Sequence, residues 1–308
     1  MRSLARRLVP LAAAIAALTA VPAASAAPPA PAAPAAPAAR HTFAVGPQYD
    51  STHVYVEPGT EQAFAASWVA TFGGSTIGPN ATQVTPTPSR TLSELIVSPV
   101  GTLSVFDYTT PVPYPFGTER TGWLVTDLDK AVRAARADGA AVTVAPFADP
   151  IGRDAVVQFP GGINAQLYVH NGPTSYPELA SVPENRLYLS PDAVGAFLRS
   201  YLAFTDGRIV SDDRRSDGAA LGLPGTTYRL IRLTSGFGTT TVAVTDGHLP
   251  YPFGRELTGY GVPDLGATLE RAKGAGASVL WGPVTAGGRG SAMVRFPGGY
   301  VAELHTER

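Results

Sequence analysis

Four short segments of the sequence place side chains capable of chemistry in the alternation typical of β-strands. Within each segment these residues share one face of the predicted strand, because successive side chains of a strand point to opposite sides. Imidazole, amide and carboxylate groups can bind divalent metal ions or hydrogen-bond a small molecule, whereas arginine attracts carboxylates and phosphates. The residues are His53 and Tyr55; Gln166, Tyr168 and His170; Arg186 and Tyr188; and Glu303 and His305.

Other kinds of chemistry find no support in the sequence. The chain has no cysteine, which removes disulfides, thiol nucleophiles and Cys-ligated zinc. There is no Ser/His/Asp order, no Gly-rich phosphate loop and no nucleotide-binding fingerprint. The formal net charge is −1, so the basic surplus of a nucleic-acid-binding protein is absent. We therefore expect a small-molecule ligand as the partner.

An internal repeat is the strongest feature of the sequence. Residues 113–129 match residues 250–266 at 11 of 17 positions, and both segments begin with Pro-Tyr-Pro-Phe-Gly. A second shared motif, Phe-Pro-Gly-Gly, stands at 159–162 and again at 296–299. Chance would give roughly one or two identities over such a length. The chain therefore contains two copies of one domain.

Each copy has the same predicted order of elements. In the first, strands at 53–56, 94–97, 102–108, 121–125, 142–144, 155–159 and 165–169 accompany helices at 61–72 and 130–137. In the second, helices are predicted at 193–204 and 267–273 among corresponding strands. Residues 212–215, Asp-Asp-Arg-Arg, are predicted to form a solvated loop. The pattern corresponds to two βαβββ modules per copy, an α+β fold.

The N-terminus has the features of an export signal. Three arginines precede the apolar segment 8–21, and Ala24-Ser25-Ala26 is a typical cleavage site. We expect a secreted, extracellular protein without a membrane span, exported by the general or the twin-arginine route. The predicted organisation is a signal peptide (1–26), a Pro/Ala-rich linker (27–47), a first domain (48–172), a linker (173–183) and a second domain (184–308).

These motifs together resemble the glyoxalase/vicinal-oxygen-chelate superfamily, which includes glyoxalases, extradiol dioxygenases and bleomycin-resistance proteins. The resemblance rests on the opening strand with His53, on the segment 125–129 followed by Ala-Asp-Gly-Ala, and on the hairpins 156–167 and 294–304. It implies tandem glyoxalase-like domains, each with a cupped mixed sheet and helices on its convex face. The concave face would hold the ligand and, in the enzymes, a divalent metal.

The resemblance also implies where metal ligands would lie, on the first and last strands of each module. In the first copy these positions fall on His53, within 105–107, on Arg120 and on Gln166. In the second they fall on Arg186, within 242–244, on Leu257 and on Glu303. Neither set is complete, and arginine cannot bind a cation. The candidate metal ligands are His53, Gln166 and Glu303, for iron, manganese, nickel or zinc. Tyr55, Arg120, Tyr168, Arg186, Tyr188 and His305 are candidates for lining the cups.

Several alternatives remain open at this point. His53 is a metal ligand, a hydrogen-bonding residue of a metal-free cup, or a surface residue; Glu303 is a metal ligand or the ion-pair partner of Arg186. The function is that of a metal-dependent lyase or dioxygenase-like enzyme acting on a small oxygen-rich molecule. The alternatives are a non-catalytic binding protein of the bleomycin-resistance type and a structural or interaction module. Whether the chain forms a homo-oligomer is also open.

Overall fold

Residues 42–307 are described here from a computed structural model of the chain. The predicted signal peptide and most of the predicted linker at 27–47 lie outside these residues, so the structure does not test them. Thr42–Gly46 lie at the end of that linker, and Ala44 forms an isolated antiparallel bridge with Val125. The described residues belong to one compact unit.

The same order of strands and helices occurs twice along the chain. The first copy contains β1 (Ser51–Tyr55), α1 (Glu61–Phe72), β2 (Ser75–Thr82), β3 (Thr91–Ser98), β4 (Gly101–Tyr108), β5 (Thr121–Leu124), α2 (Leu128–Ala137), β6 (Ala141–Ala148), β7 (Gly152–Phe159) and β8 (Ile163–His170). The second contains β9 (Glu184–Leu189), α3 (Pro191–Thr205), β10 (Arg208–Asp217), β11 (Thr227–Ser235), β12 (Gly238–Val244), β13 (Leu257–Gly261), α4 (Leu265–Gly274), β14 (Ser278–Ala286), β15 (Arg289–Arg295) and β16 (Val301–Glu307). Short 3₁₀ turns lie at Pro47–Tyr49, Gly218–Leu221 and Pro297–Gly299.

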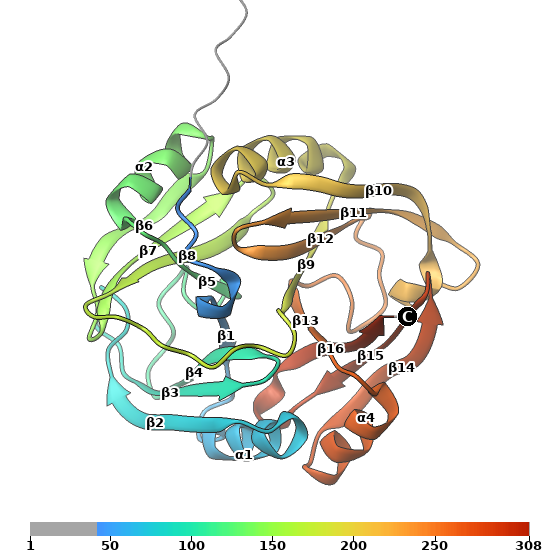
Figure 1. The fold of residues 1–308 in the computed structure, drawn as a ribbon, viewed down its shortest axis with the longest axis horizontal. Helices are drawn as coiled ribbons and strands as arrows, with labels where there is room; N and C mark the ends of the chain where they lie inside the picture. The colour runs from blue at the N-terminus through green and yellow to red at the C-terminus, as the bar shows by residue number, and fades with distance from the viewer. Residues whose placement is uncertain (1–41, 308) are drawn as a thin grey trace, which may run out of the picture. The chain divides into compact units, whose positions relative to one another are not determined.

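Each copy builds one eight-stranded mixed sheet. The order is β2-β3-β4-β1-β5-β8-β7-β6 in sheet one and β10-β11-β12-β9-β13-β16-β15-β14 in sheet two. The pairs β1–β4 and β5–β8 are parallel, and the antiparallel pair β1–β5 joins the two βαβββ modules. The α+β fold with tandem cupped sheets is therefore confirmed (Figure 1).

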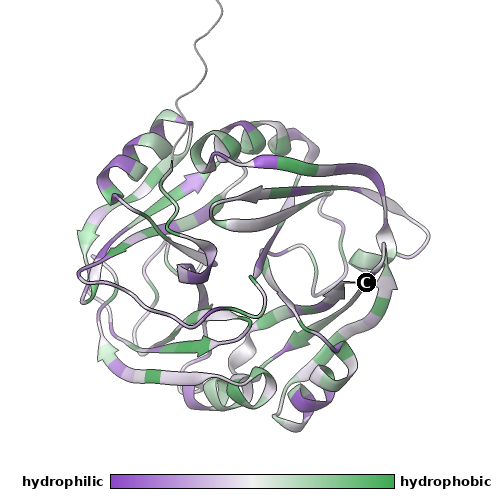
Figure 2. Ribbon diagram, in the orientation of Figure 1, coloured by the Kyte–Doolittle hydropathy of each residue, from purple (hydrophilic) through white to green (hydrophobic). Residues whose placement is uncertain are grey.

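Local sequence explains where the helices of the repeat begin. The Asp127 side chain accepts a hydrogen bond from the Lys130 amide at 2.9 Å, and Asp264 accepts one from the Ala267 amide at 2.9 Å. Both aspartates belong to the repeated motif, and both satisfy an amide that the helix itself leaves unpaired. Polar and apolar residues then alternate around α2 and α4 (Figure 2), so each helix has an apolar side to bury.

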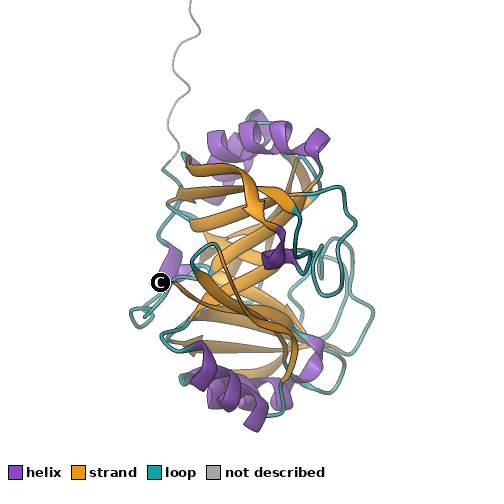
Figure 3. Cartoon of the chain, turned by 90° about the vertical axis from the view of Figure 1, so that its right-hand side faces the viewer, coloured by secondary structure: helices purple, strands orange, loops and turns teal. Residues whose placement is uncertain are grey.

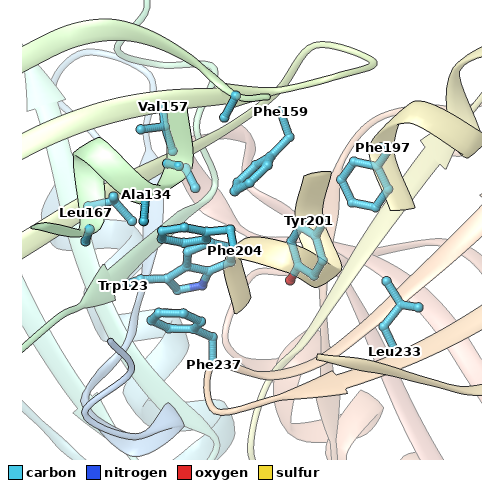
Figure 4. Close-up of a cluster of buried hydrophobic side chains, with 14 of the residues drawn as sticks. Trp123, Ala134, Val157, Phe159, Leu167, Phe197, Tyr201, Phe204, Leu233 and Phe237 are labelled. Carbon is cyan, nitrogen blue, oxygen red and sulfur yellow. The ribbon is translucent and has the colours of Figure 1, made fainter. Parts of the chain in front are cut away.

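The two hydrophobic cores are shared between the copies. One core brings Trp123 and Phe159 of the first copy against Tyr201, Phe204 and Phe237 of the second (Figure 4). Trp123 stacks on Phe237 with ring centroids 4.6 Å apart. As a result α2 lies beside α3 (Figure 1).

The other core joins the remaining two helices. Trp68 of α1 is fully buried and packs on Tyr260, with ring centroids 4.9 Å apart, and on Phe296, at 5.0 Å. Helix α1 therefore lies beside α4, and the helices occupy the two ends of the described unit with the sheets between them (Figure 3). No helix among residues 42–307 is long and apolar enough to cross a membrane.

Two edge strands are absent from the sequence prediction. β10 runs through residues 208–217, so the prediction of a solvated loop at 212–215 is wrong. Most of its residues are exposed, and it pairs only with β11. β2, the corresponding strand of the first copy, is equally exposed. Neither strand buries a face, which removes the alternation by which a strand is recognised.

Candidate functional site

The concave face of sheet one encloses a cavity of about 490 Å³. Alternation along β1 directs Val54 into the core shared with α1, while His53 and Tyr55 line the cavity, as the sequence predicts. The strand register places Ser104 of β4 opposite His53, and Gly122 of β5 opposite Gln166 of β8. Ser104, His53 and Gln166 all line the cavity. We call this cavity cup one.

Gly122 leaves open the space in front of the His53 imidazole. A Cβ atom at this position would lie 2.6 Å from His53 Nε2 and 2.8 Å from the Ser51 hydroxyl. Such a distance is far shorter than any contact a real side chain makes. The glycine therefore permits His53 to present Nε2 to the cup. The family resemblance had placed Arg120, and not Gly122, at this position of the cup.

Behind the imidazole lies a carboxylate that the sequence analysis did not identify. Glu119 is fully buried, and its Oε1 lies 3.4 Å from His53 Nδ1. The Tyr55 hydroxyl donates a hydrogen bond to the same oxygen. A carboxylate only accepts, so we assign the proton to Nδ1, which leaves Nε2 as an acceptor facing the cup. The internal repeat could have drawn attention to Glu119, because a glutamate, Glu256, occupies the corresponding position of the second copy.

Tyr55 stays protonated in this arrangement. Burial raises the pKa of its phenol well above the ordinary value, and the neighbouring Glu119 carboxylate raises that pKa further. A protonated phenol keeps donating to Glu119, which fixes the carboxylate and through it the imidazole. The ring of Tyr55 packs against Phe106 with centroids 5.2 Å apart, and the His53 ring meets Phe106 edge-on at 5.5 Å.

Acidic groups occupy the opposite side of cup one. Asp154 of β7 is buried beside Gln166; burial raises the pKa of Asp154 well above its ordinary value, Asp149 raises it further, and the hydrogen bond from Gln166 lowers it. His170 lies at the same end, and burial lowers the pKa of its imidazole. The Asp149 and Asp154 carboxyls line the cup, and among the described residues that line it there is no lysine or arginine. Cup one therefore disfavours anions.

The remaining lining of cup one is mostly apolar or aromatic. The Tyr168 hydroxyl donates to the backbone oxygen of Tyr49, so its ring is held against the wall. Further lining residues of this kind are Ile77, Phe106, Phe116, Ile151 and Tyr176. Such a mixture of aromatic surface and a few oriented polar groups is typical of small-molecule pockets.

The concave face of sheet two, cup two, is largely filled by ion pairs. Arg186 Nη1 lies 3.0 Å from Glu184 Oε1 and 2.7 Å from Glu303 Oε2, so the pairing expected between Arg186 and Glu303 is present. Arg289 contacts the same two carboxylates, at 3.1 Å and 3.2 Å. The space that remains at this face measures about 280 Å³. All four residues are buried, so each charge depends on its partners.

Three of the predicted cup residues lie at the margins of the cups or outside them. Arg120 precedes β5 and lines a cavity of about 60 Å³ that also contains Glu256. Tyr188 is packed against the apolar cluster around Leu221 and interacts with Arg186 and Glu303 of cup two. His305 lines an opening beside cup two.

Neither cup has a donor set suited to a resident divalent metal. In cup one the four strand positions hold one imidazole, one hydroxyl, one glycine and one amide: His53, Ser104, Gly122 and Gln166. No group of three or more His, Asp or Glu residues with metal-binding geometry occurs in residues 42–307. In cup two the first position is the cation Arg186. Transition metals in proteins are held mainly by several imidazoles and carboxylates, so the residues present do not fit such an ion.

Comparison with solved structures identifies the fold. A triple mutant of 4-hydroxymandelate synthase from Streptomyces coelicolor superposes with a TM-score of 0.56 at 14% identity, over 85% of this chain and 93% of that one. The Mn(II)-bound glyoxalase from Novosphingobium aromaticivorans superposes with a TM-score of 0.55 at 14% identity, over 86% and 83%. No protein-family model and no curated protein sequence matches the chain.

The resemblance inferred from the sequence is thus confirmed. The chain has the fold of the glyoxalase/vicinal-oxygen-chelate superfamily, in two tandem copies. At 14% identity this likeness defines the fold and leaves the activity to be argued from the site.

Proposed function

We propose that this protein binds a small oxygenated aromatic molecule, uncharged or cationic, in cup one, without a resident metal. The observation that carries the proposal is the cavity of about 490 Å³ whose strand positions hold His53, Ser104, Gly122 and Gln166. These groups suit hydrogen bonding to an organic ligand better than coordination of an ion.

Each part of the lining supports one property of the ligand. The aromatic walls favour a ring, because rings pack edge-to-face or offset with aromatic side chains. His53 Nε2, held by Glu119, accepts a hydrogen bond from a hydroxyl in front of Gly122. No lysine or arginine among the described lining residues can pair with an anionic ligand, and the Asp149 and Asp154 carboxyls offer hydrogen bonds to a neutral or cationic one.

The structural neighbours give this proposal limited support. One of them is named for 4-hydroxymandelate, an oxygenated aromatic molecule. We extend from it to this chain only the chemical class of the ligand, and we expect a different charge, because mandelate is an anion and the described lining of cup one holds no lysine or arginine.

A metal-dependent lyase or dioxygenase-like reaction is the alternative. One feature favours it: the carboxylate of Glu119 orients His53 in the way that carboxylates orient metal-binding histidines. Titration with Mn(II), Ni(II), Zn(II) and Fe(II) separates the two ideas, using wild type, His53→Ala and Glu303→Ala. We expect none of the four ions to bind tightly to any of the three proteins. Tight binding that His53→Ala abolishes would favour the enzyme.

A matched series of phenols tests the ligand class by isothermal titration calorimetry. Tyramine is cationic, p-cresol is neutral and 4-hydroxyphenylacetate is anionic, while the ring and hydroxyl are the same. We expect saturable binding of the first two and at least about tenfold weaker binding of the third. His53→Ala should weaken tyramine about tenfold through the lost hydrogen bond, and His248→Ala, at an exposed histidine, should not. Tightest binding of 4-hydroxyphenylacetate would contradict the proposal.

A further inference from the structure

We propose a second binding site, for a small molecule carrying a carboxylate or phosphate group, at the open end of cup two. An opening of about 1100 Å³ lies there, between sheet two and the segments Pro99–Val100 and Ala180–Val182. This site is independent of the ligand proposed for cup one, because it lies on the other sheet and has the opposite charge.

The ion-pair cluster of cup two, which reaches the opening through Glu184 and Arg289, carries an excess of positive charge. Arg186 and Arg289 are balanced by Glu184 and Glu303, which they contact at 2.7–3.2 Å. Arg232 of β11 adds a third cation to this group. Its Nη1 lies 3.7 Å from Glu184, too far for a hydrogen bond, and its side chain is one-third exposed. One guanidinium thus faces the opening with its hydrogen-bonding capacity unused by that carboxylate.

Two more arginines line the same opening. Within the described residues Arg208 of β10 has no carboxylate partner, and Arg271 of α4 bonds only to neutral oxygens, at 2.9 Å from Thr71 and 2.9 Å from Thr268. β10 pairs Arg208 with Thr234, which shares a strand face with Arg232, so these two side chains are diagonal neighbours. The described lining contains four arginines and a single carboxylate, Glu184.

A buried imidazole whose Nδ1 has no hydrogen-bond partner among the described residues also faces this opening. It belongs to His305, which is only 6% exposed. Burial and then the charges of Arg289, Arg186 and Arg232 together lower the pKa of His305 to about 3, against the opposing effect of Glu184. An anion bound beside this neutral imidazole would raise its pKa. His305 therefore reports on occupancy of the site as well as supporting it.

Guanidinium groups determine which ligand the opening fits. Their planar forks match carboxylate and phosphate oxygens in pairs, and such charge-assisted hydrogen bonds are among the stronger ones in proteins. Cup one offers none of these groups among its described lining residues. The two cups consequently have opposite ligand preferences.

The proposal is tested with inorganic phosphate and succinate as probes, on the mature full chain at constant ionic strength set with NaCl. Binding is followed by calorimetry and by the NMR shift of the His305 ring, assigned through His305→Asn. We expect saturable binding of at least one probe with a rise in the His305 pKa. Arg232→Gln and Arg208→Gln should each weaken binding about tenfold.

The matched control is Arg229→Gln. Arg229 lies on β11 as well, but it pairs with Asp212 at 2.7 Å and alternation puts it on the opposite face from Arg232. Its substitution should leave binding unchanged. Equal loss in all three variants, or no saturable binding of either probe to wild type, would overturn the proposal. If Arg232→Gln does not fold, the exposed Arg208→Gln decides the question.

Discussion

At the residue scale, the difference between the two cups depends on a few strand positions. His53 in the first copy corresponds to Arg186 in the second, and Gln166 corresponds to Glu303. The first pair brings an oriented imidazole and an uncharged amide to its cup, whereas the second belongs to the ion pairs that fill cup two. The glycine between them is common to both copies: Gly122 and Gly259 occupy equivalent places, opposite Gln166 and Glu303.

Gly122→Ala tests whether the space in front of His53 is used. The new Cβ would lie 2.6 Å from His53 Nε2, and Glu119 and Tyr55 restrict how far the imidazole can retreat. We expect tyramine binding to be lost and the free energy of unfolding to fall by about 1–3 kcal/mol through overpacking. Gly172→Ala is the control, because nothing lies within 4 Å of that position. Undiminished binding in Gly122→Ala would place the ligand elsewhere.

His305 gives the stability of the protein a defined pH dependence. Its folded pKa of about 3 lies below the ordinary value of 6.5, so between these pH values the unfolded chain binds the extra proton. The stabilisation is complete above pH 6.5 and declines as pH falls toward 3. Urea unfolding of wild type and His305→Asn at several pH values should show a smaller decline in the variant. His248→Asn, at a histidine 90% exposed, should behave as wild type.

At the element scale, the repeated motif sets the beginning of a helix in each copy. Replacing Asp127 with alanine leaves the Lys130 amide without its cap, and replacing Asp264 does the same to the Ala267 amide. Each change should lower the free energy of unfolding by about 0.5–2 kcal/mol. Urea denaturation of the two single variants provides the measurement. A negligible loss in both would show that the caps are not needed, whatever the repeat suggests.

Sequence reasoning succeeded for elements with a buried face and failed for those without one. Helix α1 is predicted at 61–72 and found there, and alternation correctly directs His53 and Tyr55 to the cup. Strands β2 and β10 were not predicted, because their sequences show no alternation of apolar and polar residues. The roles of Gly122 and Glu119 in the site were not predicted, for two different reasons. Register between β1 and β5 depends on two distant strands, and a loop residue such as Glu119 has no periodicity to place it.

At the scale of the whole molecule, each copy forms its own sheet, but both hydrophobic cores contain residues of the two copies. Trp68 of α1 is buried largely against residues of the second copy, among them Tyr260 and Phe296. A fragment ending at residue 172 would expose this tryptophan and most of its core. We expect the fragment 42–172 to lack the chemical-shift dispersion of a folded protein, whereas the 42–308 chain shows it. A well-dispersed, monomeric fragment would show that the first copy is self-sufficient.

Export of the chain remains a proposal that mass spectrometry can test. We expect protein recovered from culture supernatant to begin near Ala27, after the Ala24-Ser25-Ala26 motif. A supernatant protein whose mass includes Met1 would contradict cleavage at this motif.

The central claim is that cup one binds an organic ligand without a metal, and one calorimetric measurement addresses it directly. Tyramine is titrated into protein dialysed against EDTA, then into the same protein supplied with Mn(II). The absence of a suitable donor set at His53, Ser104, Gly122 and Gln166 predicts one-to-one binding with the same affinity in both titrations. No binding after EDTA, with binding restored by Mn(II), would contradict the account.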